Sequence, residues 1–108
     1  MRVVAAPQAR KSFRSLQRPS RVSIVEVHLP KSKVNAVHCK AQVGGYCYWT
    51  QSADVEAKRA LWVKESFELS ETEMEVEVLT ESGDSLGVAV VKLSQQGEQW
   101  FDIVGSSD

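Results

Sequence analysis

Short runs of β-branched and aromatic residues, separated by turn-forming residues, constrain this fold more than any other feature. From residue 21 onward the runs recur roughly every 8–12 residues, which predicts an all-β sandwich or barrel of about eight short strands. Gly44-Gly45 predicts a hairpin turn between two of the runs. Residues 51–59 are polar and predict a loop that has room for one helical turn. The clearest runs span residues 21–29, 36–43, 46–50, 60–70, 73–80, 86–93 and 99–104.

The chain length and the two cysteines limit the class of protein. With 108 residues, one domain is expected. No apolar run approaches 18 residues and no secretory leader is recognisable, so we expect neither a membrane span nor secretion. Cys39 and Cys47 have no metal-ligand spacing and form no disulfide framework, which favours a reducing compartment. His38 and Cys39 should point to opposite faces of a strand, with Cys39 toward the core.

The first twenty residues lack a sustained period. Pro7 and Pro19 interrupt any long helix. The sequence therefore predicts a flexible basic arm over 1–20, a β-sandwich over 21–105 and a short tail over 106–108. Two alternatives stay open for the arm. It is rich in Arg and Ser and free of acids, as organellar transit peptides are, and a partner could also order it.

The charge is distributed unevenly along the chain. Residues 1–33 carry eight Lys or Arg and one acid, a formal charge of +7, whereas the other 75 residues carry five basic and thirteen acidic groups, or −8. This split indicates a basic arm that binds an anionic partner or folds back onto its own acidic domain. The candidate basic binding residues are Arg10, Lys11, Arg14, Arg18, Lys31, Lys33, Lys58 and Arg59.

Glutamates occupy every second position of residues 71–78: Glu71, Glu73, Glu75 and Glu77. On a strand, such side chains share one face at intervals of about 6.5–7 Å, so the row does not converge on a single ion. The pattern predicts a solvated sheet face; its functional alternative is an acidic docking surface for a basic partner. Candidate core residues are Trp62, Phe67, Met74, Val76, Val78, Val88, Val90, Leu93, Trp100 and Ile103.

The order of these features resembles a C2 domain over residues 21–105. RVSIVEVHL resembles its first strand, VHCKAQVGG a later strand with a glycine turn, and Trp62, Glu65 and Phe67 its Trp-Glu-Phe element. Leu86-Gly87 and Leu93 in ESGDSLGVAVVKL resemble its Leu-Gly element, and QWFDIV its closing strand. The resemblance implies an eight-stranded antiparallel β-sandwich.

C2 domains hold calcium with aspartates from two loops at one end of the sandwich. The matching loops here read PKSKVNAV, with two lysines and no acid, and LTESGDS, with only Glu81 and Asp84. Calcium takes six to eight oxygen ligands, so these degenerate positions do not form its site. The resemblance therefore implies a calcium-independent C2-like domain without a cofactor, in which Lys31 and Lys33 neutralise Glu81 and Asp84.

No catalytic motif is present in the sequence. His28 and His38 lie on expected strands without an adjacent nucleophile motif, and there is neither a GxSxG element nor a phosphate-binding loop. We therefore expect a protein that is not an enzyme. The acidic body also disfavours nucleic acid, whose phosphates it would repel.

Two functions remain. The favoured hypothesis is a non-catalytic interaction or scaffold module that docks to a protein partner or larger assembly through its basic arm and acidic sheet face. The alternative is a peripheral membrane module that binds anionic phospholipid through basic residues of the arm and loops. The acidic body favours the first. We expect a cytoplasmic location; association with a membrane or the cytoskeleton, and organellar targeting by the arm, stay open.

Overall fold

The computed structural model describes residues 1–108 except 10–18, 31–32, 64, 69–72, 93–97 and 106–108. The described chain is all-β and contains no helix. Its ten strands are β1 (Arg2–Ala9), β2 (Pro19–His28), β3 (Ala36–Val43), β4 (Tyr46–Trp49), β5 (Ala53–Asp54), β6 (Arg59–Leu61), β7 (Ser66–Glu68), β8 (Glu73–Thr80), β9 (Ser85–Lys92) and β10 (Gln99–Asp102).

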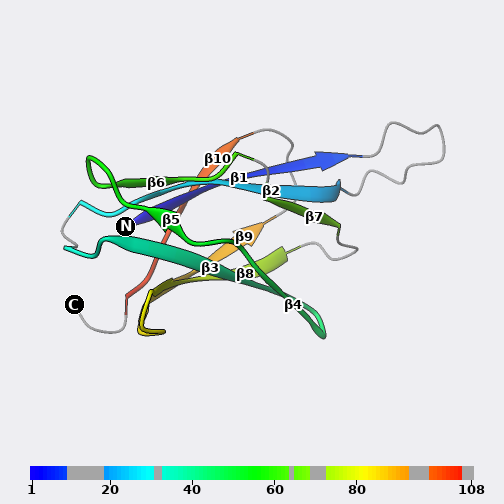
Figure 1. The fold of residues 1–108 in the computed structure, drawn as a ribbon. Coiled ribbons are helices and arrows are strands. Elements are labelled where there is room, and N and C mark those ends of the chain that lie inside the picture. The colour runs from blue at the N-terminus through cyan, green and yellow to red at the C-terminus, as the bar shows by residue number, and fades with distance from the viewer. Residues whose placement is uncertain (10–18, 31–32, 64, 69–72, 93–97, 106–108) are drawn as a thin grey trace.

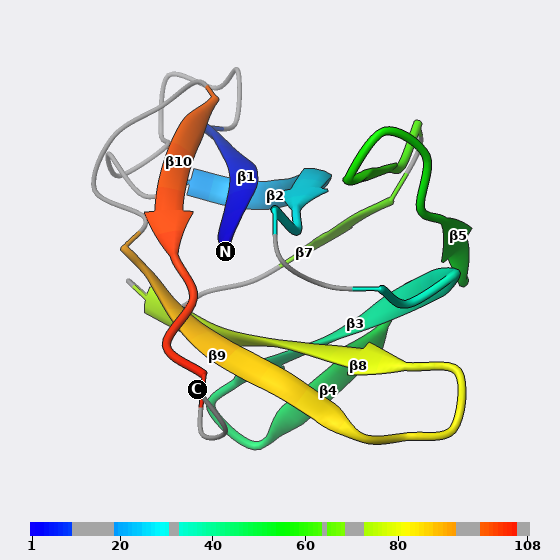
Figure 2. The same ribbon diagram turned by 90° about the vertical axis from the view of Figure 1, so that its left-hand side faces the viewer.

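The strands form two antiparallel sheets that face each other in a sandwich-like arrangement (Figures 1 and 2). Sheet A has the order β10-β1-β2-β6, with β7 also paired to β2. Sheet B has the order β4-β3-β8-β9, with β5 also paired to β3. The prediction of an all-β fold is confirmed, but eight strands is too few, because the described part of the chain already contains ten.

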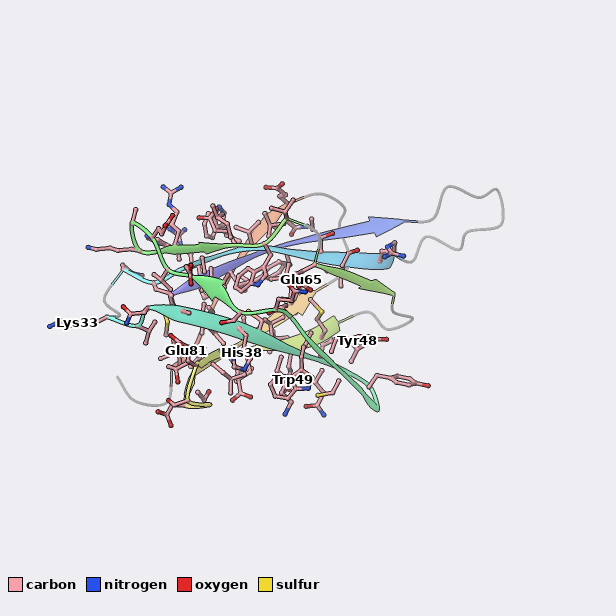
Figure 3. The ribbon with its side chains drawn as sticks, in the orientation of Figure 1. Lys33, His38, Tyr48, Trp49, Glu65 and Glu81 are labelled. Atoms are coloured by element: carbon pink, nitrogen blue, oxygen red, sulfur yellow. The ribbon has the colours of Figure 1, made fainter. Side chains whose placement is uncertain are left out.

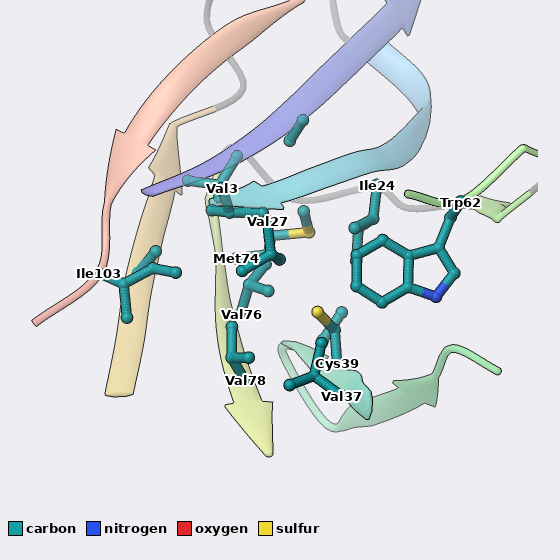
Figure 4. Packing of buried hydrophobic residues seen from close by; sticks show 14 of the residues in the cluster. Val3, Ile24, Val27, Val37, Cys39, Trp62, Met74, Val76, Val78 and Ile103 are labelled. Carbon is teal, nitrogen blue, oxygen red and sulfur yellow. The ribbon is translucent and has the colours of Figure 1, made fainter. Parts of the chain in front are cut away.

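The core lies between the two sheets (Figure 4). Val3, Ile24 and Val27 of sheet A meet the inward side chains of sheet B, and Trp62 closes one side. Each fully buried aliphatic side chain contributes about 1.5–3 kcal/mol relative to its exposed state. The sheet B contribution to the core is Val37, Cys39, Ala41, Val43, Met74, Val76, Val78, Ala89 and Val91.

The two strands with the clearest alternation form as predicted. β3 covers residues 36–43 and β8 covers residues 73–80. Along β8, Met74, Val76 and Val78 are buried, whereas Glu73 and Glu75 are exposed. The Gly44-Gly45 hairpin is also confirmed, since it joins β3 to β4, and Gly44 has the positive φ of 57° that such a turn requires.

The predicted flexible arm is wrong for residues 2–9. They form β1, which lies between β10 and β2 in sheet A, and Val3 and Ala5 belong to the core. Val4 and Ala6 are buried as well. A strand buried on both faces shows no polar alternation, so the short run Val3–Ala6 carried no strand signal. The arm residues Arg10, Lys11, Arg14 and Arg18 lie outside the described residues, between β1 and β2.

The run at 60–70 forms two short strands instead of one. β6 and β7 both pair with β2, in sequence along the same edge of sheet A. The polar segment before them holds β5 and a tight turn in which Ala57 and Lys58 have positive φ angles of 52° and 66°. The helical turn allowed by the sequence is therefore not formed.

The core prediction fails on β9 and β10. Val90 is 50% exposed and Trp100 is 47% exposed, whereas Ala89 and Val91 are fully buried. Val88 is half-buried on the same outer face as Val90. Every residue of the run from Leu86 to Val91 is apolar or glycine, so its hydrophobicity does not reveal which alternate set points inward. The side chains of Phe67 and Leu93 lie outside the described residues.

The chain crosses from sheet A to sheet B immediately after β10. Val104 forms an isolated antiparallel bridge with Val88 of β9, with backbone hydrogen bonds of 2.9 and 3.1 Å in the two directions. The crossing passes directly over Gly87, where a Cβ atom would stand 2.6 Å from Cγ2 of Ile103. Only glycine leaves room for this approach.

A second link between the sheets surrounds Trp62. Its indole Nε1 donates to the Gln51 carbonyl at 2.8 Å, and the Gln51 N–H donates to the Glu65 carboxylate at 3.0 Å. Gln51 follows β4 of sheet B, whereas Trp62 and Glu65 lie between β6 and β7 of sheet A. Buried indole N–H groups usually find such an acceptor. These two hydrogen bonds thus tie Gln51, after β4 of sheet B, to the connection between β6 and β7 of sheet A.

Candidate binding surface

The glutamate row lies on the outer face of sheet B. Glu73 and Glu75 are exposed and Glu77 is half-buried, because alternate residues of β8 point away from the core. Glu71 lies outside the described residues. The carboxylates stand in a line along one strand, and no ion pair within 4 Å joins them to a basic residue of the described chain. The row is thus an open charged surface.

Cross-strand neighbours distinguish the three carboxylates. Glu73 lies opposite Lys92, and Glu77 lies opposite Lys40. Glu75 lies opposite Gln42 on one side and Val90 on the other. Residues directly opposite each other are about 4.5–5.5 Å apart at Cβ, close enough for a lysine to offset a neighbouring carboxylate. Glu75 therefore carries the least compensated charge of this surface.

An aromatic residue borders the same face at the sheet edge. Trp49 of β4 is 56% exposed and lies opposite Lys40, whose ammonium is 5.6 Å from the centre of the indole ring. His38 packs against the indole at a centroid distance of 5.7 Å (Figure 3). The lysine is thus held over Trp49 by a cation–π contact. The face combines uncompensated acid with exposed apolar surface at Trp49 and Val90.

Three connections lie at the N-terminal end of β3, away from the Gly44-Gly45 hairpin: β2–β3, β5–β6 and β8–β9 (Figure 1). Lys33 is exposed at this end, as is Glu81 (Figure 3). Lys58 is exposed at the tip of the β5–β6 turn. Lys31 lies outside the described residues. This end therefore presents both signs of charge.

The β8–β9 turn satisfies its own polar groups. The backbone N–H of Asp84 donates to Thr80 Oγ1 at 3.1 Å, Thr80 Oγ1 and Ser82 Oγ share a hydrogen bond of 3.0 Å, and Ser82 Oγ donates to the Asp84 carboxylate at 3.2 Å. The predicted neutralisation of Glu81 and Asp84 does not occur at Lys33, with which neither forms an ion pair. Within the described ranges, no three His, Cys, Asp or Glu side chains could hold a metal ion.

Sheet A carries a second feature, which the sequence did not reveal. An open pocket of about 190 Å³ lies among residues of β1, β2, β6 and β10 on its outer face. The Arg2 guanidinium lies 4.8 Å from the Trp100 ring centre, and Arg59 approaches Glu26 at 3.7 Å. The charged groups of the pocket thus already have partners. Its lining residues are Arg2, Glu26, His28, Arg59 and Trp100.

The two cysteines differ sharply in their surroundings. Cys39 is fully buried, as predicted, and Cys47 is exposed on β4. Burial, together with the negative charge of Glu65, raises the pKa of Cys39 to about 12. The thiolate is the reactive form of cysteine, so a buried thiol with this pKa is chemically inert.

We expect a thiol-specific reagent such as DTNB to modify one cysteine per folded chain at pH 8. Only about one part in ten thousand of the Cys39 thiol would be ionised at that pH, and the reagent cannot reach it. Cys47→Ala should abolish the rapid reaction, and both cysteines should react in denaturant. Rapid release of two equivalents by the folded protein would contradict the burial of Cys39.

No helix in the described residues is both long and apolar enough to cross a membrane. Comparison with protein-family models, curated proteins and solved structures gives no match to this chain.

Proposed function

We propose that this chain is a non-catalytic, C2-like interaction module that docks a protein partner through the outer face of sheet B, without calcium. The observation that carries the proposal is the position of Glu75. It is exposed at the middle of the glutamate row and lacks a cross-strand lysine, with half-exposed Val90 beside it. A charged centre beside apolar surface suits recognition by a complementary protein segment.

The spacing of the row indicates the chemistry of the partner. Alternate residues of an extended segment repeat at about 6.5–7 Å, which matches the interval between Glu73, Glu75 and Glu77. A partner segment with alternating Lys or Arg could therefore place one cation near each carboxylate. The basic residues between β1 and β2 supply a second, oppositely charged contact for the same partner or assembly.

Binding to anionic phospholipid is the alternative, through Lys33, Lys58 and the basic residues between β1 and β2. Lys33 and Lys58 are exposed at the loop end, where each could contribute about 1 kcal/mol near an anionic leaflet. Glu56, Glu81 and Asp84 are exposed at the same end and offset that attraction. Because this end of the sandwich carries both signs of charge, we rank lipid binding below protein docking.

A labelled peptide with alternating lysine and threonine tests the proposal by fluorescence anisotropy. We expect Glu75→Gln to weaken binding about threefold to fivefold, since an exposed charge pair contributes up to about 1 kcal/mol. Glu77→Gln should change it less, because Glu77 is half-buried and lies opposite a lysine, Lys40, in the register of β3 and β8. Glu98→Gln, which removes an exposed charge elsewhere, is the matched control.

Equal weakening by Glu75→Gln and Glu98→Gln would contradict docking at this face and indicate non-specific attraction. Co-sedimentation of the full chain with phosphatidylcholine/phosphatidylserine vesicles, with and without calcium, tests the alternative. Calcium-independent vesicle binding that Lys33→Gln and Lys58→Gln weaken, with no peptide binding, would favour the lipid function. Calcium-dependent binding would overturn the calcium-independent interpretation.

A further inference from the structure

We propose that the free edge of β4 pairs with β4 of a second copy of this chain, which extends sheet B across a two-fold axis. This edge is distinct from the outer face of sheet B, so the pairing does not depend on the proposed function. β4 is hydrogen-bonded to β3 on one side, and no strand is paired to its other side in the described structure.

The hydrogen-bond pattern fixes which groups of β4 point outward. The Thr50 N–H donates to the Cys39 carbonyl of β3 at 2.9 Å, so the backbone N–H and C=O groups of Thr50 point toward β3. Backbone direction alternates along a strand, so Tyr48 also points toward β3, whereas Cys47 and Trp49 direct their N–H and C=O groups away from it. Within the part of the chain that the structure describes, no backbone group pairs with Cys47 or Trp49 on that side.

The β4 edge lacks the usual protection against strand pairing. No Lys, Arg, Asp or Glu occurs from residue 41 to residue 53, and β4 contains no proline. Its pairing with β3 shows no bulge. Exposed charge, proline and bulges are the common protective features of edge strands. The other strands at sheet edges each include a charged residue: Asp54 in β5, Arg59 in β6, Glu68 in β7, Lys92 in β9 and Asp102 in β10.

Large aromatic side chains flank the free edge. Tyr46 is 73% exposed and Trp49 is 56% exposed, the first on the inner face of the sheet and the second on the outer. Aromatic residues bury a large apolar area when a neighbouring strand covers them. An added strand would thus contact an aromatic side chain on each face of the sheet.

A second copy fits this edge better than a charged partner strand does. Antiparallel pairing requires outward-directed residues to meet outward-directed residues, and this condition is met when Cys47 of one copy lies opposite Trp49 of the other. The segment is uncharged, so self-pairing brings no like charges together. The glutamate rows of the two copies would be separated by five strand spacings, about 24 Å.

The dimer should be weak, because four residues of edge strand bury an area at the low end of specific interfaces. Sedimentation velocity of the full chain over about 5–500 μM, under reducing conditions, measures it. We expect the sedimentation coefficient to rise toward that of a dimer with concentration. A monomer throughout this range would overturn the proposal.

Cys47→Pro tests the edge itself, since it removes an outward N–H and leaves the N–H of Tyr48 for β3. We expect it to lower the association constant at least tenfold, while Cys47→Ala, which keeps the N–H, changes it less than threefold. Trp49→Lys, which places charge on the edge, should also prevent association. Circular dichroism verifies that each variant is folded.

A short bismaleimide provides an independent measurement. Near this register the two Cys47 residues are diagonal neighbours, about 7–8 Å apart. We expect the full chain to give a covalent dimer that Cys47→Ala abolishes and that Trp49→Lys reduces. Association that persists unchanged in both Cys47→Pro and Trp49→Lys would place the interface elsewhere and overturn the proposal.

Discussion

Gly87→Ala is expected to lower the free energy of unfolding by about 3 kcal/mol or more. Gly87 has a φ of +145°, a region essentially restricted to glycine, where other residues incur about 1–3 kcal/mol of strain. An added Cβ would also stand 2.6 Å from Cγ2 of Ile103 and 2.7 Å from the Val104 carbonyl oxygen. The clash involves backbone that bridges the two sheets, so it cannot be relieved by rotating one side chain.

Urea unfolding monitored by circular dichroism measures this effect. Gly45→Ala is the matched control, because an added Cβ there meets nothing within 4 Å. We expect the control to change stability by less than about 1 kcal/mol. Equal midpoints for the two variants would show that the chain does not cross over Gly87 as described.

Trp62→Ala should lower the free energy of unfolding by about 3–5 kcal/mol, the usual cost of removing a large core aromatic residue. The indole is buried in the core and its Nε1 donates to the Gln51 carbonyl. Trp62→Phe keeps much of the apolar volume but loses the donor, and we expect an intermediate cost of about 1–3 kcal/mol.

Urea unfolding by circular dichroism is again suitable, since these substitutions remove a fluorophore. Trp100→Phe serves as the control, because Trp100 is half-exposed on the outer face of sheet A. If Trp62→Ala were no more destabilising than Trp100→Phe, Trp62 could not belong to the core.

Alternation between apolar and polar residues made part of this fold predictable. β8 combines Met and Val on one side with Glu on the other, so both its extent and its inward face followed from the sequence. The same reasoning placed Cys39 in the core and His38 outside. The placement of the glutamate row on an outer face was likewise predictable, because period two fixes a face without knowledge of the neighbouring strands.

Other parts depended on information that local patterns lack. Val3–Ala6 of β1 are buried on both faces of the sheet, and Leu86–Val91 of β9 are all apolar or glycine. The sequence of neither run therefore showed which alternate residues point inward. The difference between Glu75 and Glu77 depends on whether Gln42 or Lys40 of β3 lies opposite, and this is set by the strand order and the register. The pocket at Arg2, His28 and Trp100 joins residues from both ends of the chain, beyond the reach of any sequence motif.

The position of β1 has a consequence for folding during synthesis. Arg2–Ala5 of β1 pair with Gln99–Asp102 of β10, so β1 is synthesised long before its partner strand. At about 5–20 residues per second, one edge of β1 stays unpaired for roughly 5–20 seconds. Pairing over such a separation is also intrinsically slow. The nascent chain therefore passes through an interval in which the apolar strand Val3–Ala6 is open to chaperones or to wrong partners.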